Sequence, residues 1–143
     1  MKLIAFISLS LVSLTACTHG VAPMQDRTAQ PCGNKPNCVS TEDTREAFHL
    51  APFTLTDNAT LDDVERAALM LPGAKTAERQ ADYLRIECTT RIMRFVDDLE
   101  LRIRQQQLMV RSESRLGYSD FGVNRKRAEQ LRSLLLQQGV IIE

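Results

Sequence analysis

Alternating apolar and polar residues run through the centre of the chain in three segments, 84–92, 98–104 and 108–113. This period of two is typical of a strand with one buried and one exposed face. Because only short connections such as Gln105–Gln107 separate the segments, we expect an antiparallel three-stranded meander with one apolar and one charged face. The residues predicted to share the core face are Leu84, Ile86, Cys88, Thr90, Ile92, Leu99, Leu101, Ile103, Leu108, Val110 and Ser112.

Two flanking segments have the apolar spacing of helices. The first begins after Thr60, a predicted N-cap followed by acidic residues, and ends at Pro72-Gly73. The second runs from about Asn124 to Gln138 and ends at Gly139. Apolar residues three and four positions apart give each helix one hydrophobic face. These faces comprise Leu61, Val64, Ala68 and Leu71 in the first helix, and Ala128, Leu131, Leu134 and Leu135 in the second.

The predicted elements combine into a single α+β domain over residues 31–143. Its small antiparallel sheet consists of the three-stranded meander, with two helices packed on one face. The stretch 48–55 predicts either an edge strand of this sheet or an extended arm, and 140–142 a last short strand. One domain is the natural count for a chain of 143 residues.

The first 17 residues have the layout of a secretory signal. Lys2 supplies a positive start, residues 3–15 carry no charge, and Ala16 is a small residue at the expected cleavage site. The stretch 14–17 resembles a bacterial lipobox, which implies that Cys17 is lipidated, with palmitate among the expected acyl chains, and becomes the first mature residue. The alternative is an ordinary signal peptide whose cysteine is incidental.

The lipobox resemblance implies a membrane anchor, since each buried methylene of the acyl chains contributes about 0.8 kcal/mol. Thr18 occupies the position where an aspartate favours inner-membrane retention. By analogy with Gram-negative lipoproteins, we therefore expect an outer-membrane protein facing the periplasm. Residues 1–16 are then the signal peptide, and the polar residues 17–30 a tether between the lipid and the domain.

The other three cysteines fit an oxidising compartment. Cys32 and Cys38 flank a turn-rich loop that contains Gly33 and Pro36, and a disulfide across it would stabilise the fold by about 2 kcal/mol. Zinc is the alternative, but this spacing without a neighbouring histidine or second cysteine pair is poor for zinc. We expect no metal and no cofactor. Cys88 lies in an alternating apolar run and is predicted to be a small buried hydrophobe rather than a nucleophile.

The charge balance and the apolar runs of the chain each exclude one class of protein. Lys and Arg together number 18, as do Asp and Glu, so a general nucleic-acid binder, which needs an excess of positive charge, is not expected. A polytopic membrane protein is excluded because only the first 16 residues form a sustained apolar run.

The charge is unevenly distributed along the chain, although the totals are equal. Residues 83–132 hold ten Arg and one Lys against seven acids, whereas residues 17–82 hold six bases against ten acids.

Three consecutive cations, Arg125, Lys126 and Arg127, fall in the first turn of the second predicted helix. The helix dipole is already positive there, so an anion is expected to compensate. The favoured interpretation is internal, with an aspartate accepting hydrogen bonds from arginine. The alternative is an external anion bound at the helix N-terminus. The candidate anion-binding residues are Arg115, Asn124, Arg125 and Arg127, supported by Asp97, Asp98, Tyr118, Ser119 and Asp120.

Three stretches in order, 31–41 (PCGNKPNCVST), 94–100 (RFVDDLE) and 111–127 (RSESRLGYSDFGVNRKR), resemble the family catalogued as Domain of Unknown Function 1499. The resemblance covers nearly all of the chain after the predicted tether and implies a small, often signal-bearing or lipid-anchored protein. Gly33, Asn34 and Lys35 depart from the proline, acid and serine that are commoner there. The family offers no activity to transfer.

Three functions compete at this stage. The first is a lipid-anchored, non-catalytic module that binds an anionic small molecule. The second is a periplasmic hydrolase or transferase using Asp97, Asp98, Ser119 and Asp120, but it lacks a partnered histidine as general base. The third is a structural envelope protein that binds a protein partner. The sequence favours a non-catalytic module and leaves the oligomeric state open.

Overall fold

Nine elements form in residues 25–143, the part of the chain that this computed structural model describes. They make an α+β fold, as predicted, with seven strands in one sheet and two helices. No helix in this part is long and apolar enough to cross a membrane. In chain order the elements are β1 (Cys38–Ser40), β2 (Phe53–Leu55), α1 (Leu61–Ala68), β3 (Ala74–Arg79), β4 (Tyr83–Thr89), β5 (Val96–Arg104), β6 (Gln107–Ser114), α2 (Val123–Gln137) and β7 (Ile141–Ile142).

The sheet is antiparallel and larger than predicted. Its strands lie in the order β3-β4-β5-β6-β2-β7, and β1 also pairs with β6. The three alternating segments form β4, β5 and β6, with Leu84 opposite Leu101 and Leu101 opposite Val110. The prediction of a three-stranded meander with one edge strand therefore gave too few strands, since the sheet has seven. The missed strand β3 is a polar edge strand without an apolar face, and β1 has only three residues beside a turn-rich loop.

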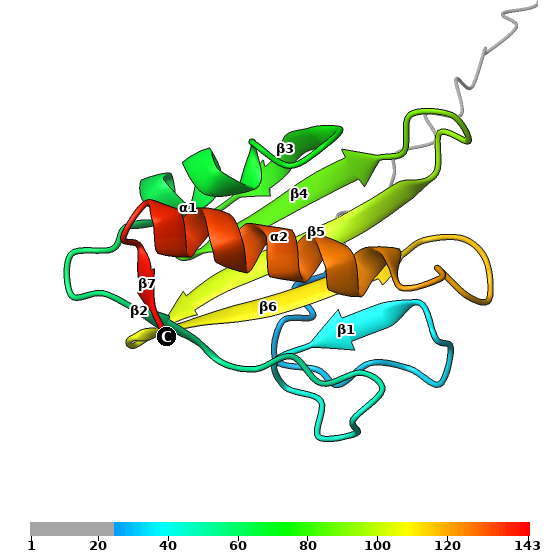
Figure 1. The fold of residues 1–143 in the computed structure, drawn as a ribbon, viewed down its shortest axis with the longest axis horizontal. Coiled ribbons are helices and arrows are strands. Elements are labelled where there is room, and N and C mark those ends of the chain that lie inside the picture. Colours follow the sequence, from blue (N-terminus) through cyan, green and yellow to red (C-terminus); the bar gives the residue numbers. More distant parts are fainter. Residues whose placement is uncertain (1–24) are drawn as a thin grey trace, which may run out of the picture.

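Both helices cover the same face of the sheet (Figure 1). The hydrophobic core lies between them and the inward positions of the central strands, as the alternation predicted. One expected core position is wrong: Ile92 is 87% exposed, because β4 ends at Thr89 and the residues that follow form a turn. The fully buried apolar residues include Leu84, Ile86, Leu99, Leu101, Val110, Ala128, Leu131 and Leu135.

Gly73 joins α1 to the sheet at a close approach. Thr60 is the N-cap, as predicted, but α1 ends at Ala68, five residues before Gly73. Gly73 adopts a φ of +68°, and a Cβ placed on it would lie 2.2 Å from the carbonyl oxygen of Thr89. The Thr89 amide donates to the Gly73 carbonyl at 3.0 Å. Only glycine fits here, so the 69–73 connection is held tightly against the end of β4.

The predicted disulfide between Cys32 and Cys38 is present, and Cys88 is free and buried. Buried Asp43 holds the disulfide loop in place. Its carboxylate accepts hydrogen bonds from the Arg45 guanidinium and from the Cys32 amide, at 2.7 and 2.9 Å. These bonds outweigh the effect of burial and hold the pKa of Asp43 well below its usual range.

The chain segment before the disulfide packs against the face of the sheet opposite the helices. Asp26 pairs with Arg102 of β5, Arg27 pairs with Glu100, and Thr28 is fully buried. Residues 26–28 of the predicted tether therefore belong to the folded part. The predicted signal peptide 1–16, the lipidation site Cys17 and tether residues 17–24 lie outside the described residues.

Candidate functional site

The start of α2 is neutralised from within the protein. The Asp120 carboxylate accepts hydrogen bonds from the backbone amides of Gly122 and Asn124, at 2.9 and 2.8 Å. It also accepts a bond from the Asn124 side chain. These contacts occupy amides that an external anion would need at the helix N-terminus. An aspartate of the protein itself thus occupies this helix start, which is the interpretation that the sequence favoured.

Arg127 lies in a buried polar network on the helix side of the sheet. Its guanidinium donates to Asp97 and to Asn124 at 2.6 Å each, and to the Ser112 hydroxyl at 3.1 Å. All four residues are buried. The network joins α2 to β5 and β6, and its aspartate compensates the charge of Arg127.

The four predicted anion-binding residues do not converge on one site. Arg125 donates to the backbone carbonyls of Ala47 and His49, away from Arg127. Arg115 lies on the opposite face of the sheet, where it pairs with Asp98 at 2.7 Å. Asn124 is wholly buried in the polar network. Of the predicted set, only Arg127 borders a sizeable cavity.

The predicted supporting acids are also separated. Asp97 and Asp98 are consecutive in a strand and point to opposite faces, as their partners Arg127 and Arg115 show. Asp97 is connected to Asp120 only through the side chains of Arg127 and Asn124. No two of these carboxylates are arranged to share a proton.

The loop side chains point to solvent. Tyr118 is exposed, as is Ser119, whose hydroxyl accepts a hydrogen bond from the Phe121 amide. Within residues 25–143 there is also no group of three His, Cys, Asp or Glu side chains that would hold a metal ion.

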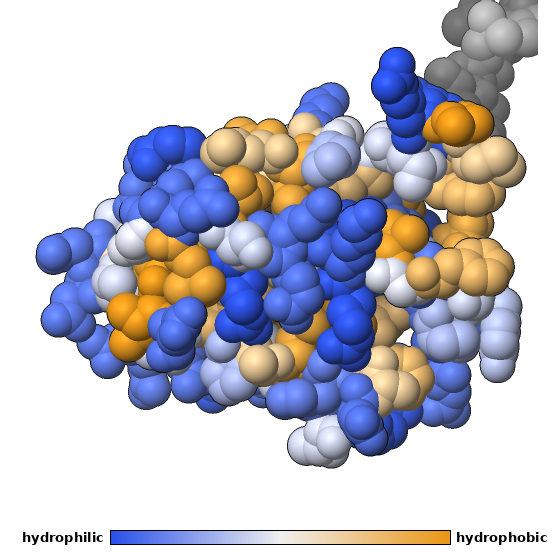
Figure 2. All heavy atoms as spheres, in the orientation of Figure 1, coloured by the Kyte–Doolittle hydropathy of each residue, from blue (hydrophilic) through white to orange (hydrophobic). Residues whose placement is uncertain are grey.

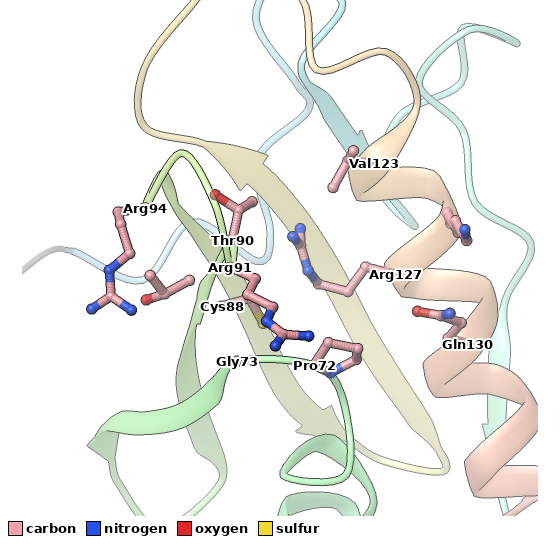
Figure 3. A pocket seen from close by; sticks show the side chains of 11 residues that line it. Pro72, Gly73, Cys88, Thr90, Arg91, Arg94, Val123, Arg127 and Gln130 are labelled. Atoms are coloured by element: carbon pink, nitrogen blue, oxygen red, sulfur yellow. The ribbon is translucent and has the colours of Figure 1, made fainter.

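A cavity of about 570 Å³ opens between the 90–95 turn, the Pro72-Gly73 connection and the first half of α2 (Figure 3). Its volume falls in the range of small-ligand pockets, ~300–1,000 Å³. Four of the lining residues are cationic, and none is acidic. The lining consists of Pro72, Gly73, Cys88, Thr89, Thr90, Arg91, Arg94, Val123, Lys126, Arg127 and Gln130.

Three of the four cations have no anionic partner. In the part of the chain that the structure describes, no ion pair or side-chain hydrogen bond involves Arg91, Arg94 or Lys126. All three are exposed, whereas Arg127 is buried and neutralised by Asp97. The cavity therefore carries a net positive charge that nothing around it balances.

The cations enter the cavity from two sides. Figure 3 shows Arg127 extending from α2 toward the strands, Arg91 extending back from the turn, and Arg94 directed outward, away from Arg127. Cys88 lies at the base and is 1% exposed. Its burial raises the pKa of the thiol, so the thiol stays protonated and is a poor nucleophile. This geometry can hold an anion, with threonine hydroxyls nearby as further donors.

Sequence analysis missed most of this site. The predicted strand ran through Ile92, which placed Arg91 on the charged face of the sheet and not beside a cavity. The stretch 90–95 (TRIMRF) contains two arginines and no acid. That lack of a local counter-ion was the available signal.

The opposite face of the sheet, which we call the paired face, contrasts with the cavity. Five arginines on it, Arg27, Arg85, Arg102, Arg111 and Arg115, each pair with at least one carboxylate. Glu100 lies at its centre, fully buried, and accepts from Arg27 at 3.2 Å. Burial raises the pKa of Glu100 despite the opposing charge of Arg27.

A family model described as "Protein of unknown function (DUF1499)" matches residues 28–135. Neither the curated proteins nor the solved structures give a match. The matched range begins at buried Thr28 and ends within α2, and it contains every residue that lines the cavity.

Proposed function

Because the chain belongs to the DUF1499 family, whose description assigns no activity, we propose a function from its own geometry: it is a non-catalytic module that binds an anionic ligand. The ligand occupies the cavity between the 90–95 turn and α2. Arg91 and Lys126 are its principal contacts, with Arg127 behind them and Arg94 at the rim.

The observation that carries this proposal is the lack of counter-ions in the cavity. The arginines named on the paired face each have a carboxylate partner, yet Arg91, Arg94 and Lys126 line a hollow with no acidic residue. Like charges held close together without counter-ions repel one another, and a bound anion relieves that repulsion. Hydrogen bonds from guanidinium groups to an oxyanion are also among the stronger ones in proteins.

A binding role fits these side chains better than the alternative of a hydrolase or transferase. The residues of that alternative, Asp97, Asp98, Ser119 and Asp120, occupy separate positions with structural partners. The cavity is lined by two kinds of nucleophilic group, the threonine hydroxyls and the thiol of Cys88, and that thiol is protonated. General acid–base chemistry needs a proton donor or acceptor within reach of the ligand, and the cavity lining contains no His, Asp or Glu.

Inorganic pyrophosphate is a suitable probe, because it presents oxyanions without any further group to recognise. Isothermal titration calorimetry should show binding that weakens with added salt, as expected for an exposed cationic site. The double variant Arg91→Glu/Lys126→Glu should bind roughly a hundredfold more weakly or not at all, since two charge-assisted contacts become repulsive.

The matched control is Lys75→Glu/Arg104→Glu. These two cations are also exposed and without ion pairs in residues 25–143, lie outside the cavity, and give the same change in net charge. Equal weakening in both double variants would mean that only net charge matters, which would contradict a defined site.

We also propose that the module is lipidated at Cys17 and held at the periplasmic side of the outer membrane. The supporting observations are the uncharged stretch 3–15 and the lipobox-like residues 14–17. Metabolic labelling with palmitate in a Gram-negative host should mark the wild-type chain. Labelling that persists in Cys17→Ser would contradict the assignment.

A further inference from the structure

Seven large hydrophobic side chains are exposed in segments that adjoin the cavity through Arg91, Arg94 and Val123. They belong to two segments: the 90–95 turn and the loop that runs from β6 into α2. The segments are neighbours, because the Arg115 amide approaches the Val96 carbonyl and β6 ends beside the start of β5. The seven residues, which we call the apolar rim, are Ile92, Met93, Phe95, Leu116, Tyr118, Phe121 and Val123.

The apolar rim is concentrated at one end of the molecule. Figure 1 shows both segments projecting beyond the sheet at the same end, and Figure 2 shows hydrophobic side chains gathered there beside the hydrophilic surface of α2. Ile92 is 87% exposed and Phe121 is 96% exposed. Scattered exposed apolar residues are ordinary, but a cluster of this kind marks a contact surface.

Backbone geometry holds the rim outward. Phe121 adopts a φ of +54° and Arg94 a φ of +56°, a left-handed conformation that bulky residues rarely adopt. The fold thus keeps an aromatic ring almost wholly in water on a backbone that disfavours it. Such a conformation persists where the surrounding structure imposes it, and it is commonest at functional sites.

The charge around the rim identifies what it contacts. The 90–95 turn holds two arginines among three apolar residues and no acid, and Lys126 lies three residues after Val123 on α2. Protruding apolar tips beside unpaired cations are complementary to a bilayer surface, where the tips enter the boundary between headgroups and acyl chains and the cations meet phosphates.

We propose that the apolar rim and the cavity together dock on a bilayer that contains anionic phospholipid. The anion in the cavity is then a lipid headgroup phosphate. This inference rests on the proposed anion-binding function and names the source of the anion. The hydrophobic side chains Ile92 and Phe121 enter the membrane while Arg91 and Lys126 contact the phosphate.

The chain contains no tryptophan, so Phe121→Trp in the full chain introduces a single reporter at the tip of the rim. It is mixed with vesicles of phosphatidylcholine alone or with an equal part of phosphatidylglycerol, and with acyl chains carrying bromine as a quencher. Emission should shift to the blue and be quenched on the anionic vesicles only. The control Ile142→Trp lies at the other end of the sheet (Figure 1) and should stay water-like on both.

Charge reversal connects the insertion to the cavity. Arg91→Glu/Lys126→Glu should lower the insertion of the Phe121→Trp reporter at least about thirtyfold, at roughly 1 kcal/mol for each cation removed. Lys75→Glu/Arg104→Glu should leave most of it. Insertion that is equal on neutral vesicles, or unaffected by the cavity variant, would overturn the inference.

The outcomes separate this inference from the proposed function. Pyrophosphate binding without insertion on anionic vesicles refutes membrane docking and leaves the anion site standing. Insertion that depends on the cavity charges without pyrophosphate binding supports docking and refutes a site for free anions. Burial of the reporter in solution together with a dimeric mass by sedimentation assigns the rim to a second copy of the chain, and so overturns docking.

Discussion

The paired face and the cavity use the same residue type in opposite ways. On the paired face, arginines such as Arg27 and Arg111 lie among buried or half-buried carboxylates. Around the cavity, Arg91 and Arg94 belong to a turn without an acid and are exposed to solvent. Both regions are rich in arginine, but around the cavity three cations line one hollow without a carboxylate partner among the described residues.

The difference follows from where each arginine lies in the sheet. Long antiparallel strands place residues of neighbouring strands side by side, so an arginine on β4 meets carboxylates on β4 and β5. A turn beyond the strand ends has no neighbouring strand on one side that would supply a carboxylate. Arginine at that position is available to a ligand, whereas within the sheet it contributes to stability. Substitutions on the paired face should therefore lower stability, whereas substitutions of the exposed cations around the cavity should weaken binding.

The largest expected loss of stability comes from Arg127, the one cation lining the cavity that pairs with a carboxylate among the described residues. Arg127→Met leaves the buried carboxylate of Asp97 without its cation and should lower the free energy of unfolding by about 3–5 kcal/mol. Urea denaturation followed by circular dichroism measures this. The double variant Asp97→Leu/Arg127→Met should recover part of the loss, because it no longer buries an unpaired charge. A loss under about 1 kcal/mol in Arg127→Met would contradict the buried pairing.

A smaller loss is expected on the paired face. Arg27→Met removes the hydrogen-bond donor nearest to the fully buried Glu100 and should lower the free energy of unfolding by about 2 kcal/mol. The same denaturation assay applies. A neutral result would mean that residues 26–28 do not contribute to the folded domain.

The paired face should also carry a pH dependence, of smaller size than the loss of Arg27. The folded-state pKa of Glu100 is raised above 4.5, chiefly by burial. Ionising it therefore destabilises the fold, and the penalty appears as the pH rises through the folded-state pKa. The free energy of unfolding of Glu100→Gln relative to wild type should rise with pH over this window and level off below pH 4.5. A relative stability that falls with pH would contradict the direction of the shift.

The smallest stability effect is expected at the cavity. Arg91→Ala and Lys126→Ala remove exposed side chains without ion pairs, so each should change the free energy of unfolding by no more than about 0.5 kcal/mol. Pyrophosphate binding should nevertheless weaken in both. A stability loss as large as that of Arg27→Met would mean that these cations stabilise the fold, as the arginines of the paired face do.

Most of the fold could be predicted from sequence because its central elements have a clear periodicity. Alternation located β4 to β6, and the N-cap Thr60 and the stop at Gly139 located the helices. Strand β3 was missed because an edge strand that faces solvent has no apolar alternation. The pairing of Asp26 and Arg27 with the sheet depends on residues more than seventy positions apart in the sequence, which no local pattern records.

The candidate site was predicted only in part. The excess of cations at the start of α2 was visible in the sequence, and internal compensation by aspartate describes Arg127 well. The same pattern gave no indication of which of Arg115, Arg125 and Lys126 remain without a carboxylate. That depends on which side of the sheet each side chain reaches, and Arg125 in fact binds backbone carbonyls.

The most direct test of the central claim is a map of backbone amide chemical shifts in the full chain during titration with pyrophosphate. The account predicts that the shifts concentrate at Gly73, Thr90, Arg91 and Lys126, which line the cavity. It also predicts that Arg27, Glu100 and Arg111 on the paired face stay unchanged. Shifts centred on the paired face, or spread evenly over all exposed cations, would contradict a binding site between the 90–95 turn and α2.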